Sequence, residues 1–162
     1  MKALSIHQPW AWAILHAGKC VENRTWQTHH RGPLLIHASK SRRSSDAWPA
    51  DEWRERFGLD RPPWEELPTG VLVGVVELVA CLPLAEWREW HAAGDPRATH
   101  VEAMTSPWAE GPWCWVLAEP KAFANPKPCK GQQNLFEVAD GEAATRHACV
   151  RMTVAAAHNP LR

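Results

Sequence analysis

The longest hydrophobic stretch of the chain covers residues 71–84 and reads VLVGVVELVACLPL. Its β-branched residues predict a strand that is buried on both faces within a sheet or barrel. Gly74 lies inside this stretch, and an isolated glycine there predicts a bulge or a tight bend. Alternation along the strand predicts two faces, with Val71, Val73 and Val75 on one and Leu72, Gly74 and Val76 on the other.

Shorter strand-like segments surround this stretch. KALSI at the N-terminus predicts a strand that ends at HQP, because Pro9 restricts Gln8 to extended geometry. Turn residues separate the other segments, as is typical of short strands. These segments are CVENRTW (20–26), RGPLLIHA (31–38), WCWVLAEPKAF (113–123) and NLFEV (134–138). We expect a proline-rich loop over residues 124–133.

Hydrophobic residues at helical spacing predict three helices. The first has a proline in its first turn and a glycine where it stops. The predicted helices cover residues 10–18, a segment through Phe57 that Ser45 or Asp46 would cap, and residues 84–93. We expect a loop over residues 94–112, and the tail over residues 141–159 favours a helix weakly.

This order of elements contains several short strands and no repeated strand–helix–strand unit. It therefore argues against a doubly wound parallel sheet. We predict an α+β fold, a small mixed β-barrel with helices covering the barrel openings. A length of 162 residues suits one domain, which we place at residues 1–140, with a C-terminal tail over 141–162 that packs on it or extends it.

Composition narrows the class of protein. No apolar run reaches the roughly 18 residues that span a bilayer, and the N-terminus turns polar at His7, too early for a secretory signal. The five cysteines are odd in number and show no CxxC spacing, which argues against a disulfide framework. We therefore expect a cytoplasmic protein without membrane association.

Charge is segregated along the chain although the formal net charge is zero. Residues 19–43 hold six bases and one acid, residues 121–133 hold three bases and no acid, and residues 44–118 hold 13 acids and five bases. Such segregation predicts a basic face that suits a nucleic acid, unless it reflects ordinary loop charge. The 11 tryptophans allow base stacking but also suit a core.

The segment AGKCVENRTW, residues 17–26, carries the clearest candidate chemistry. Strand alternation predicts that Glu22 and Arg24 share one face, with Lys19 close by. The two cations can hold a phosphate or polarise a carbonyl, and a buried Glu22 could relay protons. An ion pair without further function remains the alternative.

Further candidates lie outside this segment. His7, Gln8 and Trp10 join the first strand to the first helix, where exposed amides favour an anion. Arg31, Lys127 and Lys130 are candidates for phosphate contacts. The nine histidines show no HxH or HExxH spacing, so we expect no metal and no cofactor.

Four segments resemble, in family order, the ASCH (activating-signal-cointegrator homology) domain. They are LSIHQPWAWAILHAGKCVENRTW, RGPLLIHA, GVLVGVVELVAC and PWCWVLAEPKAFANPKPCKGQQNLFEV. The resemblance implies a PUA-like β-barrel, a fold shared with domains that bind modified or structured RNA. The family signature GxKxxExR reads AGKCVENR here, with Ala17 in place of the glycine. It implies that Lys19, Glu22 and Arg24 lie in the ligand-binding cleft.

The resemblance leaves two classes of function open. The first is a module that binds RNA, a nucleotide or a modified nucleoside, with DNA as the alternative polymer. The second is an amidohydrolase that removes the acetyl group of acetylcytidine, with Lys19 and Glu22 as its catalytic residues. Glu22 stands where that branch has a threonine, and Glu77 is one choice for a second glutamate. A metal-assisted ribonuclease has the weakest support.

Overall fold

The computed structural model describes residues 1–41 and 49–139. Its six strands are β1 (Lys2–Ile6), β2 (Val21–Arg24), β3 (Gly32–Ala38), β4 (Val71–Pro83), β5 (Trp113–Pro128) and β6 (Leu135–Glu137). Its α-helices, in the described ranges, are α1 (Trp10–His16), α3 (Ala50–Phe57), α4 (Leu84–Ala92) and α5 (Val101–Met104). A short 3₁₀ helix covers Trp64–Glu66.

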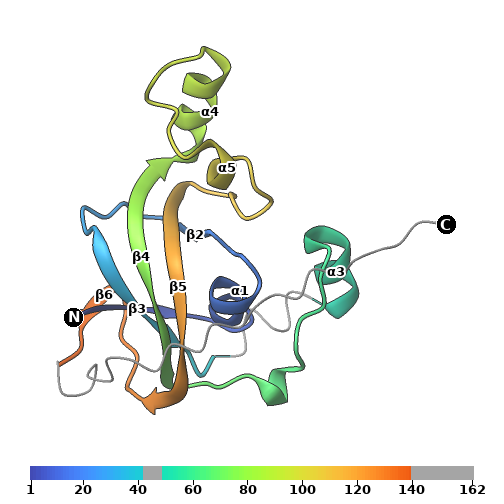
Figure 1. Ribbon diagram of the computed structural model, residues 1–162, viewed down its shortest axis with the longest axis vertical. Helices are drawn as coiled ribbons and strands as arrows, with labels where there is room; N and C mark the ends of the chain where they lie inside the picture. Colours follow the sequence, from blue (N-terminus) through green and yellow to red (C-terminus); the bar gives the residue numbers. More distant parts are fainter. Residues whose placement is uncertain (42–48, 140–162) are drawn as a thin grey trace.

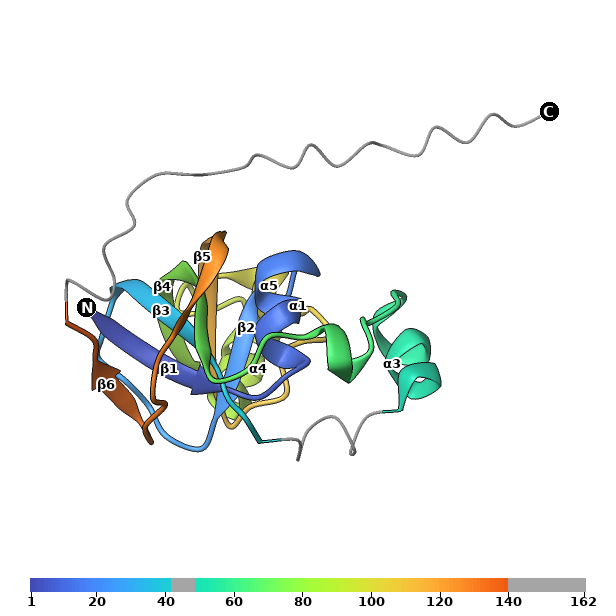
Figure 2. The same cartoon turned by 90° about the horizontal axis from the view of Figure 1, so that it is seen from below.

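The strands form one mixed sheet in the order β2-β5-β4-β3-β1-β6. Strands β1 and β3 pair in parallel, and every other pair is antiparallel. The sheet curls into a half-barrel, and the long strands β4 and β5 bend along their length (Figure 1). Helix α4 lies beyond the end of β4, and α3 stands beside the sheet (Figures 1 and 2). The predicted α+β fold, built on a curled mixed sheet, is confirmed.

The main core lies between the curled sheet and α1. Ala11 and Ile14 of this short helix pack with Leu4 of β1, Ile36 of β3 and Trp115 of β5. All five side chains are at most 1% exposed. Burial of this apolar surface, at about 25 cal/mol per Å², fixes α1 on the inner face of the sheet although the helix has only two turns.

The predicted bulge in β4 is confirmed, and it overturns strict alternation along the strand. Against β3 the register shifts at this point: Leu72 pairs with His37 and Gly74 with Ile36, so Val73 is the extra residue on β4. Val73 and Val76 therefore pack in the same core cluster, whereas Val75 packs in a second cluster with Leu72. A strand that gains one residue on one side turns its later side chains to the opposite face.

Two loop predictions were wrong in part. Residues 94–112 contain α5, and β5 runs on to Pro128, through the first half of the segment 124–133 that we expected to be a proline-rich loop. Residues 129–133 lie outside any helix or strand, as expected. Within the described residues, β2 pairs with residues 113–116 of β5 and leaves the later part of β5 unpaired on that side. Pro120 and Pro126 fall where the register with β4 shifts, so neither has a β4 register partner, and such positions tolerate a residue without an N–H group. The proposed caps Ser45 and Asp46 and the tail beyond residue 139 lie outside the described residues.

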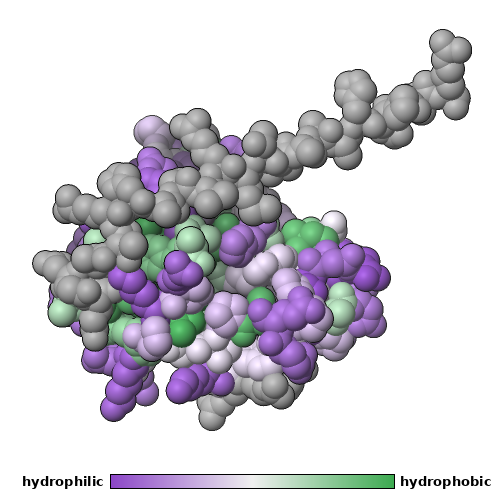
Figure 3. Space-filling model, turned by 60° about the horizontal axis from the view of Figure 1, so that its bottom comes forward, coloured by the Kyte–Doolittle hydropathy of each residue, from purple (hydrophilic) through white to green (hydrophobic). Residues whose placement is uncertain are grey.

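A separate core, distinct from the cluster of Leu72 and Val75, is built from tryptophans. Trp53 of α3 is fully buried, its ring centroid lies 4.8 Å from that of Trp10, and Phe57 stacks on Trp108 at 4.0 Å. This aromatic cluster attaches α3 to the start of α1. On the face seen in Figure 3, hydrophobic residues are interspersed with hydrophilic ones. No helix of the described residues is long and apolar enough to cross a membrane.

Candidate functional site

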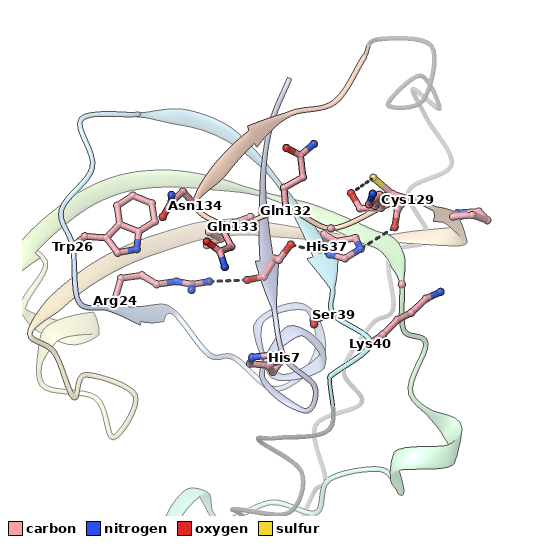
Figure 4. Close-up of a pocket in the computed structure, with 16 residues that line it drawn as sticks. His7, Arg24, Trp26, His37, Ser39, Lys40, Cys129, Gln132, Gln133 and Asn134 are labelled. Atoms are coloured by element: carbon pink, nitrogen blue, oxygen red, sulfur yellow. Dashed lines mark hydrogen bonds between the residues drawn. The ribbon is translucent and has the colours of Figure 1, made fainter.

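A cavity of about 1130 Å³ opens at the carboxyl ends of the parallel strands β1 and β3. Ser5 and His7 come from the end of β1, and His37 and Lys40 from the end of β3. The segment 128–134 closes the opposite side (Figure 4). Arg24 and Trp26, which lie at and after the end of β2, complete the wall. Gly70 also lines the cavity, so the topology brings five separate segments of sequence around it.

Cationic and amide groups dominate the rim of this large cavity. Arg24 donates a hydrogen bond from Nη2 to the carbonyl oxygen of Ser5 at 2.8 Å. Lys40 and Lys130 are exposed and form no ion pair within the described part of the chain. The side chains of Gln132, Gln133 and Asn134 are exposed along the same rim (Figure 4). The cavity therefore offers positive charge and amide donors and acceptors to a ligand.

Two buried or half-buried rings form its walls. Trp26 meets Trp115 edge to face at 4.7 Å, and its carbonyl oxygen accepts a hydrogen bond from Nε1 of Trp115 at 3.3 Å. His37 is 3% exposed and contacts Ser5 and the carbonyl group of Cys129. Burial lowers the pKa of His37, so its ring is neutral at neutral pH.

A second cavity, of about 270 Å³, lies beside α1 and α3. Aromatic rings of Trp10, Phe57 and Trp108 line it together with the charged groups of Lys19, Glu22 and Glu110. Lys19 Nζ lies 5.4 Å from the ring centroid of Trp10 and 5.7 Å from that of Trp108, and it donates to the carbonyl oxygen of Val21. These contacts already stabilise much of the positive charge of the Lys19 ammonium group.

The three residues of the signature form one chain of charges between the two cavities. Glu22 Oε2 lies 3.7 Å from Lys19 Nζ, and Glu22 Oε1 lies 3.2 Å from Arg24 Nε. Burial lowers the pKa of Lys19, and the nearby carboxylates of Glu22 and Glu110 act in the opposite direction. The structure thus brings the three side chains together, but Lys19 and Glu22 line the small cavity and Arg24 lines the large one.

The other predicted site residues are distributed unevenly. His7 and Lys130 line the large cavity, and Trp10 lines the small one. Gln8 is buried and bonded through its amide to the carbonyl oxygen of Pro68 and the amide N–H of Trp12.

Arg31 and Lys127 line neither cavity. Arg31 Nη1 donates to the carbonyl oxygens of Thr28 and His30, which stabilises its own turn. Lys127 pairs with Leu72 across β5 and β4. Their role as ligand-binding residues stays a prediction, as it does for the other candidates.

Sequence reasoning missed Trp26, His37 and Lys40 as residues of the large cavity. Trp26 comes from the segment after β2 and the other two from the end of β3, and only the pairing of the strands brings them to one cavity. In the ranges 1–41 and 49–139, no three His, Cys, Asp or Glu side chains come together to hold a metal ion.

Comparisons with known proteins give one consistent result. Activating signal cointegrator 1 from Homo sapiens is 28% identical over 137 residues, which cover 83% of this chain and 22% of that protein. Its counterpart from Mus musculus is 38% identical over 88 residues, which cover 53% of this chain and 15% of that protein. The chain thus spans about a fifth of the length of these relatives or less.

Two solved structures of ASCH from Zymomonas mobilis, the protein itself and a point mutant, are 15% and 13% identical to this chain. Their TM-scores are 0.45 and 0.49, they match 88% of this chain, and the match covers 90% and 92% of theirs. The model of the ASCH domain family matches residues 4–127. The chain therefore belongs to the ASCH domain family.

Proposed function

We propose that this ASCH protein binds single-stranded RNA and holds one nucleotide in the large cavity. The family is PUA-like and is often linked to RNA binding. The observation that carries the proposal is the combination of Arg24, Lys40 and Lys130 around a cavity of about 1130 Å³. That volume is ample for a nucleotide, because small-ligand pockets typically measure about 300–1,000 Å³.

Each part of the cavity has a role in this proposal. Lys40 and Lys130 lie exposed on the rim, where they can neutralise the phosphates on either side of the bound nucleotide. Trp26 offers a rigid aromatic surface next to Arg24, which suits stacking of an unpaired base. The amides of Gln132–Asn134 carry both donors and acceptors, which suits the edge of a base.

Titration of a fluorescent single-stranded RNA tests this proposal. We expect the double variant Lys40→Ala/Lys130→Ala to lose at least about tenfold in affinity, because it removes two phosphate contacts. Lys121→Ala is the matched control, since Lys121 is exposed, pairs with Glu119 at 3.4 Å and lines neither cavity. Equal losses in both variants would show that the large cavity does not bind the strand. The same titration with DNA of equal sequence measures the contribution of the 2′-hydroxyl groups.

The small cavity supports a second candidate, the amidohydrolase activity on acetylcytidine. Lys19 is 4% exposed, its pKa is lowered by burial, and Glu22 lies 3.7 Å from it. A buried lysine beside a carboxylate is an arrangement that can move a proton between substrate and protein. Release of acetate from acetylcytidine, and its loss in Glu22→Gln at unchanged fold, would support this candidate. Absence of acetate release by the unaltered protein would remove it.

A further inference from the structure

A serine and a histidine form a hydrogen-bonded pair on the wall of the large cavity. Ser5 and His37 are register partners on the parallel strands β1 and β3, so their side chains project to the same side of the sheet. Ser5 Oγ lies 3.1 Å from His37 Nδ1, and His37 Nε2 lies 3.0 Å from the carbonyl oxygen of Cys129. Both residues line the cavity.

These contacts determine the protonation of the pair. A carbonyl oxygen only accepts, so Nε2 of His37 carries the ring proton and donates it to Cys129. Nδ1 is then the basic nitrogen and accepts the hydroxyl proton of Ser5. The ring is neutral because burial lowers its pKa. A hydroxyl group, an adjacent base and a third group that orients the base are the elements of an activated nucleophile.

Two further features lie against the pair. A Cβ atom on Gly131 would lie 2.9 Å from Ser5 Oγ and 2.4 Å from His37 Cε1, so the backbone here approaches the pair more closely than any other residue type permits. Arg24 donates to the backbone carbonyl oxygen of Ser5, and both residues line the cavity. A cation on the cavity wall favours the negative charge of a tetrahedral intermediate.

We propose that Ser5 and His37 form a nucleophile–base pair that hydrolyses carboxylic esters in the large cavity. Ser5 Oγ attacks the ester carbonyl carbon while His37 Nδ1 takes the hydroxyl proton. The C–O bond of the ester breaks, His37 returns the proton to the departing alcohol, and the acyl group stays on Ser5. Water then attacks the acyl-serine while His37 takes one of its protons. The carboxylic acid leaves, and that proton restores the hydroxyl group of Ser5.

The charge of the cavity narrows the substrate class. Lys40 and Lys130 favour an anionic alcohol part, and the proposed function makes a nucleotide with an acylated sugar hydroxyl the natural substrate. This part of the inference rests on the proposed function. The pair itself does not, because its geometry is independent of what the rim binds. The neutral ester p-nitrophenyl acetate therefore tests the pair alone, and an adenosine monophosphate acetylated on its ribose tests the substrate class.

The decisive experiment combines covalent labelling with kinetics on the full chain. We expect a fluorophosphonate probe to label Ser5, as identified by peptide mass spectrometry, and p-nitrophenyl acetate hydrolysis to fall at least about 100-fold in Ser5→Ala. Ser39→Ala is the matched control, because Ser39 lies in the same cavity and its hydroxyl oxygen accepts a hydrogen bond from the amide N–H of Ser41 and, among the described residues, none from a histidine. Hydrolysis that survives in Ser5→Ala, or a label on another residue, would overturn the proposal.

The second variant, His37→Gln, separates chemistry from structure. Glutamine can still donate to Cys129 but is not a base, so kcat should fall with KM little changed and with the thermal midpoint retained. The pH profile of the unaltered protein should lose activity on acidification, as His37 becomes protonated. The titratable or charged groups that share its cavity are His7, Arg24, Lys40, Cys129 and Lys130. Ser5, Gly131 and Phe136 also face the ring.

The two proposals fail separately. RNA affinity measured on Ser5→Ala reports the binding function, and ester hydrolysis reports the pair. Strong RNA binding without hydrolysis of either ester would overturn the catalytic pair alone. Hydrolysis of p-nitrophenyl acetate without preference for the acetylated nucleotide would keep the pair and remove the nucleotide as its substrate.

Discussion

Glu22 Oε1 lies 3.2 Å from Arg24 Nε, and this ion pair forms part of the wall between the two cavities of the protein. The glutamate side chain is 11% exposed and the arginine side chain 24% exposed. Glu22 lines the small cavity and Arg24 lines the large one. A change at Glu22 is therefore expected to affect the folding of the wall, the buried Lys19 behind it and the position of the Arg24 guanidinium.

Glu22→Gln should destabilise the protein by about 3 kcal/mol, because it leaves the buried Lys19 ammonium without its nearest carboxylate. Urea denaturation followed by tryptophan fluorescence measures this. The matched control is Glu137→Gln, which removes the exposed ion pair with Lys2, whose N–O distance is 2.8 Å. That change should cost less than about 1 kcal/mol. Similar costs at both positions would contradict the burial of the Lys19–Glu22 pair.

The free energy of unfolding should rise with pH over the range in which Lys19 titrates. Burial lowers its pKa, so the charged form is disfavoured in the folded protein. Burial of the charged lysine therefore lowers the free energy of unfolding most at pH values below the pKa of Lys19 in the folded protein. This loss disappears as the pH approaches the pKa of lysine in the unfolded chain, about 10.4. The thiols of Cys81 and Cys114, whose pKa values burial raises, act in the opposite direction.

The difference between the unaltered protein and Lys19→Met isolates the lysine. Methionine cannot titrate, so the stability of the unaltered protein relative to Lys19→Met should rise between about pH 7.5 and about pH 9.5. Urea denaturation midpoints of both proteins, measured at these two pH values, test this. A relative stability that stays constant would mean that Lys19 does not release its proton in that range.

Lys19→Met should leave RNA affinity within about twofold, because the ammonium group lines the small cavity and makes no contact with the large one. Arg24→Met is the matched comparison and should weaken binding by about tenfold, since it removes a cation from the cavity wall. Isothermal titration with the same oligonucleotide measures both. A larger loss in Lys19→Met than in Arg24→Met would move the binding site to the small cavity.

RNA binding should weaken steeply with salt. For a single strand, each neutralised phosphate contributes about −0.7 to the slope of the logarithm of the affinity against the logarithm of the salt concentration. Removal of Lys130 should therefore make the slope shallower by about 0.7, whereas Lys121→Ala should leave it unchanged. Fluorescence anisotropy at several salt concentrations provides both slopes. Parallel lines for Lys130→Ala and the unaltered protein would exclude a phosphate contact at this residue.

Gly74→Ala should destabilise the fold by about 1–3 kcal/mol, because an added methyl group would overpack the bulge of β4. A Cβ atom there would lie 2.6 Å from the carbonyl oxygen of Lys121 and 2.7 Å from Cδ2 of Leu15. In a Leu15→Ala background, Gly74→Ala should still lower the free energy of unfolding, but by less than in the unaltered protein, since the Lys121 backbone cannot move away. Chemical denaturation of the unaltered protein, the two single variants and the double variant measures this. If Gly74→Ala had no cost in the Leu15→Ala background, the backbone contact would be contradicted.

The sequence by itself determined the local structure of this protein. Alternating and β-branched segments predicted all six strands, and Pro9 and Gly18 marked the ends of α1. These features depend on neighbours along the chain, so they can be read without a tertiary structure. The family resemblance then agreed with the predicted fold class and implied that Lys19, Glu22 and Arg24 lie in the ligand-binding cleft.

Only the tertiary structure decided how these elements combine. The bulge at Val73, next to Gly74, turned Val76 to the face of Val73, which strict alternation along an isolated strand cannot indicate. The last part of β5 stayed a strand through Pro120 and Pro126 because both fall where the register with β4 shifts. The pair of Ser5 and His37 exists because β1 and β3 align in parallel register, and contacts between residues 32 positions apart are set by packing.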